Sequence, residues 1–244
     1  MTPTPASARR GLSVVVPVYN EARWLEGVID EILARRAELP DPLSVIVLND
    51  GSDDWSAALE QRLRRRGPVE LWSSYPNAGK GAVLNRAFPL LDTRYAVVID
   101  ADGEYPAADI PQLLGPLLRG EADWVLGSRY GFGRPRPRQY RLTYLVNRGI
   151  NVWFRWLSGI GLHDVLTGLY AFRAELVADL KLRERRFSYT AELMWRLRHG
   201  AVRLAEVPVG YRFRSYAEGK KIRWWETGTI LLAMLRYKFD RSVP

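Results

Sequence analysis

Asp100 and Asp102, separated by Ala101, form the acidic pair of this sequence that is best suited to chemistry. They follow the apolar segment Tyr95–Ile99 and precede a Gly-Glu-Tyr-Pro turn, which predicts a buried strand that ends at the pair. Two carboxylates this close repel each other, and a divalent cation is the usual reason to keep them together, because hard oxygen ligands suit Mg²⁺ or Mn²⁺. Taken alone, the pair is also compatible with a solvated turn of helix-capping aspartates.

Polar clusters follow three other apolar segments of the first half. They comprise residues 17–21 (Pro-Val-Tyr-Asn-Glu), 49–54 (Asn-Asp-Gly-Ser-Asp-Asp) and 127–129 (Gly-Ser-Arg). Ligands of open α/β sheets bind beyond the carboxyl ends of the strands, where we expect these clusters to meet. Four polar clusters at four strand ends favour a ligand site over a solvated turn.

Apolar segments and helical spacing alternate along the first half. The expected strands are Leu12–Val18, 43–48, 69–73, Tyr95–Ile99 and 123–127, and the expected helices are 21–36, 57–66, 80–90 and 109–118. Such an order indicates an α/β fold with a mainly parallel, Rossmann-like sheet that helices cover on both faces. The second half is less regular, with helices expected at 142–160, 190–198 and 223–239 and strands at 168–173 and 202–213. No linker is evident, so we expect one domain.

Charge is distributed unevenly along the 244 residues, whose net charge is +9. Residues 1–125 carry 13 Lys and Arg against 18 Asp and Glu, whereas residues 126–244 carry 23 against 9. An acidic half can hold cations, and a basic half attracts phosphates, an anionic membrane surface or nucleic acid.

Composition excludes some kinds of site. The sequence has no cysteine, which excludes disulfides, and only two histidines, which argues against a multi-histidine zinc site. Residues 1–11 are expected to be a disordered tail, and no segment is apolar enough to span a membrane.

The polar clusters together predict a nucleotide site. Asp50 ends the second strand, where dinucleotide-binding folds place an acidic residue against a ribose hydroxyl. The first strand lacks the G-x-G-x-x-G turn that brings a backbone close to a pyrophosphate, so a metal ion on Asp102 would hold the diphosphate. Residues 77–81 (Asn-Ala-Gly-Lys-Gly) lack the P-loop spacing and are also compatible with a helix-starting turn. A nucleoside diphosphate with a metal suggests a nucleotide-sugar.

Five segments resemble, in order and spacing, the family 2 glycosyltransferases with a GT-A fold. They are VVPVYNE (15–21), LNDGSDD (48–54), NAGKG (77–81), DADGEYP (100–106) and GSRY (127–130). Further along, DVLTGLYAF (164–172), EVPV (206–209) and Arg214 with Lys220-Lys221-Ile222 resemble the polyprenyl-phosphate branch, which includes dolichol-phosphate mannose synthases. The resemblance implies a GT-A domain over 12–222 with a C-terminal acceptor-side subregion. It leaves 223–244 as an amphipathic helix packed on the domain or at the membrane surface.

The resemblance implies a role for each matched residue. Donor binding falls on Pro17, Tyr19, Glu21, Asp50, Lys80, Asp100 and Ala101. The metal, Mg²⁺ or Mn²⁺, falls on Asp102 and on Glu104, which stands where the family often has Gln. Contacts to acceptor and donor phosphates fall on Arg129, Arg214, Lys220 and Lys221. Arg134 and Arg141 are added to this set from the basic segment 132–141. That segment is expected to be either a lid over the acceptor phosphate or a solvated surface loop. The implied catalytic group is Asp100, Asp102, Arg129, Arg214 and Lys221.

The implied reaction is an inverting transfer from a GDP-mannose or UDP-hexose type donor to a polyprenyl or dolichyl phosphate. A phosphate acceptor is ionised at pH 7 and needs no strong general base. A hydroxyl acceptor on a glycan, lipid or small metabolite is the alternative, and it would need one. Glu192 is then the candidate base, although an exposed or paired helix carboxylate is the simpler interpretation of that residue.

The tryptophan-containing helices 142–160 and 223–239 are compatible with core packing or with an interfacial position on a membrane. We expect peripheral attachment to the cytoplasmic leaflet, with a homo-oligomer or a membrane-protein partner left open.

Two other functions fit the sequence less well. A sugar nucleotidyltransferase would need a glycine-rich basic loop after the first strand, and the sequence has none there. A nucleic-acid binder gives the acidic clusters no purpose, so we expect no nucleic-acid partner.

Overall fold

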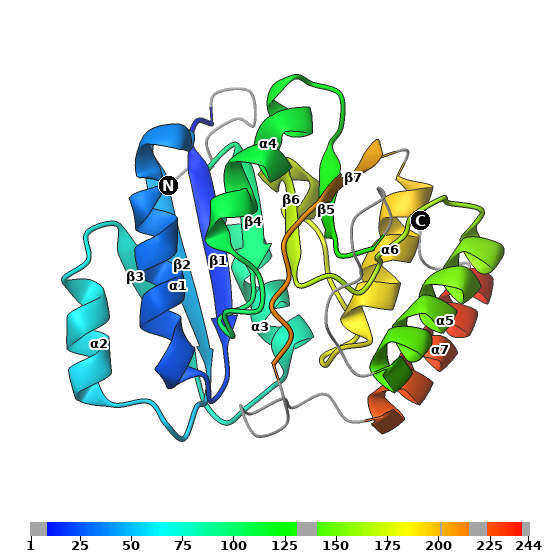
Figure 1. The fold of residues 1–244 in the computed structure, drawn as a ribbon, viewed down its shortest axis with the longest axis horizontal. Coiled ribbons are helices and arrows are strands. Elements are labelled where there is room, and N and C mark those ends of the chain that lie inside the picture. The colour runs from blue at the N-terminus through cyan, green and yellow to red at the C-terminus, as the bar shows by residue number, and fades with distance from the viewer. Residues whose placement is uncertain (1–8, 131–140, 201, 215–223, 241–244) are drawn as a thin grey trace.

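A computed structural model describes residues 9–130, 141–200, 202–214 and 224–240, and these ranges bound every structural statement below. Their strands form one seven-stranded sheet in the order β3-β2-β1-β4-β6-β5-β7 (Figure 1). The strands are β1 Leu12–Val18, β2 Leu43–Asp50, β3 Val69–Ser74, β4 Tyr95–Ile99, β5 Trp124–Ser128, β6 Leu169–Arg173 and β7 Leu204–Pro208. Only β6 among them is antiparallel to its neighbours, so the mainly parallel sheet predicted from the sequence is confirmed.

Helices follow most strands. They are α1 Ala22–Ala34, α2 Ala57–Arg64, α3 Lys80–Ala87, α4 Ile110–Leu118, α5 Arg141–Ser158, α6 Tyr189–His199 and α7 Trp224–Phe239. Each lies within a few residues of its predicted position. None of the helices in the described ranges is both long enough and apolar enough to cross a bilayer.

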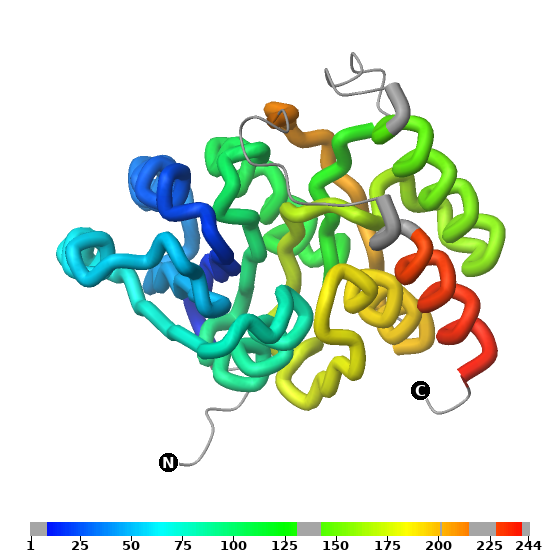
Figure 2. The backbone as a smooth tube through the Cα atoms, turned by 90° about the horizontal axis from the view of Figure 1, so that it is seen from below, coloured from blue at the N-terminus to red at the C-terminus, as the bar shows by residue number. Residues whose placement is uncertain are grey.

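The sheet has a separate apolar core on each face. Helices α1, α2 and α4 pack against one face, and α3, α5, α6 and α7 pack against the other (Figures 1 and 2). Alternate residues of β1 divide between the two cores, with Val14 and Val16 on the α1 side and Val15 on the α3 side. Burial on both faces explains why the strands are apolar throughout instead of alternating with polar residues.

The last predicted strand, 202–213, is shorter than expected. β7 ends at Pro208, which lacks the N–H that a continuing ladder would use. The next residues bond to loops instead: Gly210 N donates to Asp109 Oδ2 at 2.6 Å, and Arg212 N donates to the carbonyl of Glu104 at 2.7 Å. Residues 209–214 therefore leave the sheet and cross beyond the end of β4.

The carboxyl ends of the parallel strands share one edge of the sheet. The loops after β1, β2, β4 and β5 meet there, as the polar clusters predicted. Because β6 runs the opposite way, its amino-terminal end lies at this same edge. Gly168, directly before β6, is thereby brought next to the end of β4.

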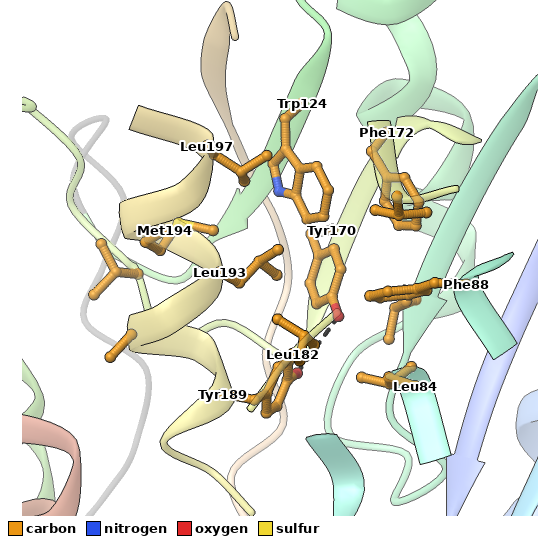
Figure 3. Packing of buried hydrophobic residues seen from close by; sticks show 14 of the residues in the cluster. Leu84, Phe88, Trp124, Tyr170, Phe172, Leu182, Tyr189, Leu193, Met194 and Leu197 are labelled. Carbon is orange, nitrogen blue, oxygen red and sulfur yellow. Dashed lines mark hydrogen bonds between the residues drawn. The ribbon is translucent and has the colours of Figure 1, made fainter. Parts of the chain in front are cut away.

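Aromatic side chains join α6 to the sheet (Figure 3). The rings of Trp124 and Phe172 stack with centroids 4.4 Å apart, and Trp124 also stacks on Tyr170 at 5.3 Å. The Tyr170 and Tyr189 hydroxyls lie 3.4 Å apart and connect β6 with α6. These rings fill the space between α6 and the strands β5 and β6.

The aromatic packing predicts a large loss of stability when Phe172 is replaced by Ala. Phe172 is fully buried, and truncation of such a ring costs roughly 3–5 kcal/mol of unfolding free energy. Phe239→Ala, at an exposed ring, is the matched control and should change it by less than about 0.5 kcal/mol. Urea unfolding followed by circular dichroism measures both, and equal effects would contradict the packing described.

Candidate active site

Three carboxylates crowd the loop after β4. Asp102 Oδ1 accepts a hydrogen bond from Glu104 N at 2.9 Å, and Asp100 lies on the other side of Asp102 in the chain. Burial, followed by the charges of Asp100 and Glu104, raises the pKa of Asp102 to about 7. The carboxylates of this loop therefore need positive charge from other elements.

Two cations from other elements reach this acidic loop. Lys80, the first residue of α3, forms a very short ion pair with Asp100, and this pair outweighs the effect of burial and raises the lysine pKa. Arg214 comes from the segment after β7 and pairs with Glu21 at 2.7 and 3.1 Å and with Asp102 at 3.2 Å. Arg214 thus connects the ends of β1 and β4. These contacts bring together Glu21, Asp102 and Arg214, which the sequence placed in one predicted site.

Glu104 anchors the crossing segment 209–214. Its carboxylate accepts a short hydrogen bond from the Tyr211 hydroxyl and a 3.0 Å bond from Arg214 N. Both oxygens of Glu104 are therefore occupied by protein donors. Its predicted role as a second metal ligand stays a prediction, and the contacts seen are those of a positioning residue.

Asp50 organises the loop that carries Lys80. The Asp50 carboxylate accepts bonds from the backbone N–H groups of Ala78 and Gly79 and from Asn77 Nδ2, each at 2.8 Å. Gly79 has a φ of 97°, a left-handed conformation that suits glycine at the start of α3. The predicted contact of Asp50 with a ribose stays a prediction beside this structural role.

The loop after β1 is tied to the loop after β2. Asn20 has a φ of 51°, its N donates to Ser52 Oγ at 3.0 Å, and its Oδ1 accepts from Asp53 N at 2.7 Å. Tyr19 next to it is partly exposed. Of the other predicted donor residues, Pro17 and Ala101 are buried and can offer only backbone groups to a ligand.

Arg129 is held by a buried partner that the sequence did not indicate. Asp164 has no exposed surface and accepts bonds from Arg129 N, Nε and Nη2 at 2.9, 2.7 and 2.8 Å. The guanidinium also lies 5.1 Å from the centre of the Tyr211 ring and 6.0 Å from that of Tyr105. In this geometry Arg129 fastens the end of β5 to the loop before β6, and its predicted contact with a phosphate stays a prediction.

Glu192 has the contacts of a structural residue. It is 0% exposed, its Oε2 accepts from Arg183 N and Glu184 N at 2.8 and 2.9 Å, and its Oε1 pairs with Arg196 at 2.9 Å. These contacts argue against Glu192 as a general base, because a base must reach the proton that it removes.

Part of the predicted phosphate-binding set lies outside the described residues. Arg134, Lys220 and Lys221 belong to it, as does most of the proposed lid 132–141. Arg141 begins α5, but its side chain is not described. Their roles stay predictions.

The acidic loop fits a metal ion that is shared with a phosphate ligand. Within the ranges that the structure describes, no three acidic or histidine side chains converge on one metal position. Mg²⁺ commonly takes one or two carboxylates and completes its shell with substrate phosphates. The raised pKa of Asp102 marks the place where a cation would relieve charge repulsion. Asp102 is thus the carboxylate best suited to such an ion.

Gly168 is a site residue that the strand and helix pattern did not single out. A Cβ added at Gly168 would overlap the Asp100 carboxylate, and Gly168 N donates to the Tyr105 hydroxyl at 3.0 Å. The glycine lets β6 begin directly against Asp100. Its position depends on the antiparallel placement of β6, which the segment around it in the sequence does not reveal.

The comparisons with known proteins agree on one family. A model of glycosyl transferase family 2 matches residues 13–173. Polyprenol monophosphomannose synthase of Mycolicibacterium smegmatis is 27% identical over 215 residues, which cover 85% of this chain and 79% of the relative. Dolichyl-phosphate hexose transferase of Haloferax volcanii is 32% identical over 209 residues, which cover 84% of each chain.

Solved structures agree as well. Glucosyl-3-phosphoglycerate synthase of Mycobacterium tuberculosis, crystallised with Mn²⁺, UDP and phosphoglyceric acid, gives a TM-score of 0.71 at 26% identity, covering 96% of this chain and 80% of that one. The same enzyme with Mg²⁺ and UDP gives 0.69, also at 26% identity, covering 98% and 82%. The predicted GT-A fold is confirmed by these matches.

Replacement of Gly168 by Ala should weaken nucleotide binding. The added methyl group has to displace the Asp100 carboxylate, so we expect the Kd of UDP or GDP in the presence of Mn²⁺ to rise by about tenfold or more. Gly27→Ala, on α1 with no atom within 4 Å of the new Cβ, should leave the Kd unchanged. Titration calorimetry measures both variants, and an unaltered Kd in Gly168→Ala would remove Asp100 from the nucleotide site.

Proposed function

Because the chain belongs to glycosyl transferase family 2, and is therefore a glycosyltransferase, we propose that it transfers a hexose from a nucleotide-sugar to a polyprenyl or dolichyl phosphate. The observation that carries the proposal is the acidic loop of Asp100 and Asp102, compensated by Lys80 and Arg214 at the carboxyl edge of the sheet. Relatives named for transfer to polyprenol and dolichyl phosphates supply the acceptor class.

The donor side is assigned to the loops after β1, β2 and β4. The solved relatives bound UDP with Mn²⁺ or Mg²⁺, and we propose a UDP-hexose or GDP-mannose type donor here. Asp100, fixed by Lys80, would face the donor, while Asp102 would hold the metal ion. When bound, that ion would neutralise charge on the departing diphosphate.

The transfer would be a single displacement with inversion at the anomeric carbon. An oxygen of the acceptor phosphate forms the new bond to this carbon while the bond to the diphosphate oxygen breaks, and the diphosphate keeps the electron pair. A phosphate monoester has a second pKa of about 6, so its oxygen is already anionic at pH 7. The burial of Glu192 accords with a reaction that needs no general base.

A hydroxyl acceptor is the second candidate. It is favoured by one finding, the structural likeness to a synthase crystallised with phosphoglyceric acid. It would require a base other than Glu192, since that carboxylate is enclosed by Arg196 and two backbone N–H groups.

An apolar face on α5 and α7 supports attachment to a membrane. The two helices lie side by side at one end of the molecule (Figure 2). They expose large apolar side chains next to basic ones, namely Leu145, Val152, Trp156, Leu232 and Phe239 with Arg148 and Lys238. Such a face suits the interface of an anionic bilayer, and we propose that the protein binds peripherally to the cytoplasmic leaflet.

The proposed reaction predicts metal-dependent transfer to a lipid phosphate. In a panel of UDP- and GDP-sugars with Mn²⁺ or Mg²⁺, one donor should give glycosyl phosphoryl polyprenol, and chelation with EDTA should abolish the product. Mass spectrometry of the lipid fraction measures it.

Parallel reactions with phosphoglyceric acid and free sugars test the alternative acceptors. A product with a hydroxyl acceptor and none with polyprenyl phosphate would contradict the proposal and leave the family assignment intact.

The apolar face predicts membrane affinity. Trp156→Ala with Leu232→Ala removes two exposed apolar side chains, each worth roughly 1.5–3 kcal/mol when buried, so binding to phosphatidylglycerol vesicles should weaken by at least about tenfold. The control is Leu90→Ala with Leu118→Ala, two exposed leucines outside α5 and α7. Vesicle sedimentation measures both doubles, and equal binding would argue against this face.

A further inference from the structure

A small cavity lies beside α5, outside the acidic loop. Its volume is about 50 Å³, and its lining consists of Tyr130, Tyr144, Arg148, Asn151, Arg155 and His163. About 10–15 Å³ of such space holds one water molecule, so the cavity accommodates a group larger than a single water. The lining offers two guanidinium groups, an imidazole, an amide and two phenols and has no carboxylate.

Asn151 gives the cavity an unused donor. The side chain is only 2% exposed, and its Oδ1 accepts from Val165 N at 3.0 Å, which fixes the orientation of the amide. Its Nδ2 has no hydrogen-bond partner among the residues that the structure describes. A buried N–H group without an acceptor costs roughly 1–3 kcal/mol, so an acceptor atom from a ligand would stabilise this arrangement.

Carboxylates near the cavity already have hydrogen-bond donors of their own. Glu206 accepts bonds from the backbone N–H groups of His163 and Asp164 and lies 2.8 Å from His163 Nδ1. Asp164 is paired with Arg129. Within the described ranges Arg148 has no ion-pair partner, and Arg155 makes only a 3.4 Å bond to a carbonyl. The cavity therefore carries unbalanced positive charge and suits an anion.

The cavity belongs to the carboxyl edge of the sheet. Tyr130 follows Arg129 at the end of β5, and Asn147 Nδ2 donates to its hydroxyl at 3.1 Å. His163 precedes Asp164, the buried partner of Arg129. An anion bound here lies on the α5 side of the same edge that carries the acidic loop.

An apolar stripe runs next to the cavity along α5. Tyr144, Arg148, Asn151 and Arg155 are spaced by four, three and four residues and share one face of the helix. The exposed residues Leu145, Val152 and Trp156 share a second face, roughly 90° away at about 100° per residue. A ligand with a compact anionic head and an apolar tail fits both faces at once.

We propose that this cavity binds the phosphate monoester of a lipid acceptor, with Arg148 and Asn151 as donors to its oxygens and the first part of the lipid chain on the stripe of Leu145, Val152 and Trp156. The inference rests on the proposed transfer to a lipid phosphate and assigns acceptor recognition to residues of α5. Inorganic phosphate has no apolar chain to cover the stripe, and an uncharged lipid alcohol has no anionic group to fill the cavity.

Two variants test the head-binding contacts. Asn151→Asp keeps the oxygen that accepts from Val165 N and replaces the free N–H₂ with a second carboxylate oxygen, which repels phosphate. Arg148→Gln removes an exposed charge. Each should raise the KM for polyprenyl phosphate and the Kd of farnesyl phosphate by about tenfold, with the KM for the nucleotide-sugar unchanged. Arg65→Gln on the opposite face of the sheet is the control and should alter neither value.

Calorimetry with three probes separates head from tail. Farnesyl phosphate should bind at least about tenfold more tightly than farnesol or inorganic phosphate, and Trp156→Ala should weaken the binding of farnesyl phosphate but not that of inorganic phosphate. Unchanged melting temperatures by circular dichroism establish that the variants are folded.

The outcomes distinguish this inference from the proposed reaction. If the wild type glycosylates polyprenyl phosphate but both variants keep its KM within about twofold, the cavity assignment is overturned and the reaction stands. If the wild type glycosylates no lipid phosphate, the proposed reaction fails, and loss of farnesyl phosphate binding in the variants would still support the cavity.

Discussion

The concentration of negative charge beyond β4 is the constraint on which the rest of the structure depends. Asp100, Asp102 and Glu104 lie within five consecutive residues, and burial together with the charges of Asp100 and Glu104 raises the pKa of Asp102. Arg214 supplies compensating charge from 112 residues along the chain, and its other partner, Glu21, lies 193 residues away. The path of 209–214 across the end of β4, and the bonds of Glu104 to that segment, follow from the need to place this guanidinium.

A second buried pair organises another part of the same strand-end edge. Arg129 and Asp164 connect the end of β5 to the loop before β6 and have almost no contact with solvent. Removing one partner of such a pair leaves an uncompensated buried charge, so both residues are needed to hold this junction. Along the strand-end edge lie an acidic region around Asp102 and a basic region next to α5, which are the regions that we propose for the donor diphosphate and for the acceptor.

The sequence predicted the strands and the meeting of the polar clusters at one edge of the sheet well, because both depend on local pattern. Tyr95–Ile99 and Leu12–Val18 were found at their observed bounds, and the polar clusters after them meet as expected. Contacts between distant residues were not predictable in this way. The partnership of Arg129 with Asp164, the closeness of Gly168 to Asp100 and the enclosure of Glu192 all depend on tertiary placement. The strand over 202–213 was predicted too long, because its apolar pattern continues past Pro208 into a segment that bonds to loops.

The long return of the chain to β4 has a consequence for how the protein is made. During synthesis the strands β1 to β4 and their acidic loop leave the ribosome first, and Arg214 follows more than a hundred residues later. Until then Asp102 has no arginine beside it, and the carboxylates of Asp100, Asp102 and Glu104 repel one another. The contacts around Asp102 are therefore completed late, although its acidic neighbours are made early. A fragment that ends at Arg173, where the family match ends, would contain these acidic residues and Lys80 but would lack Arg214.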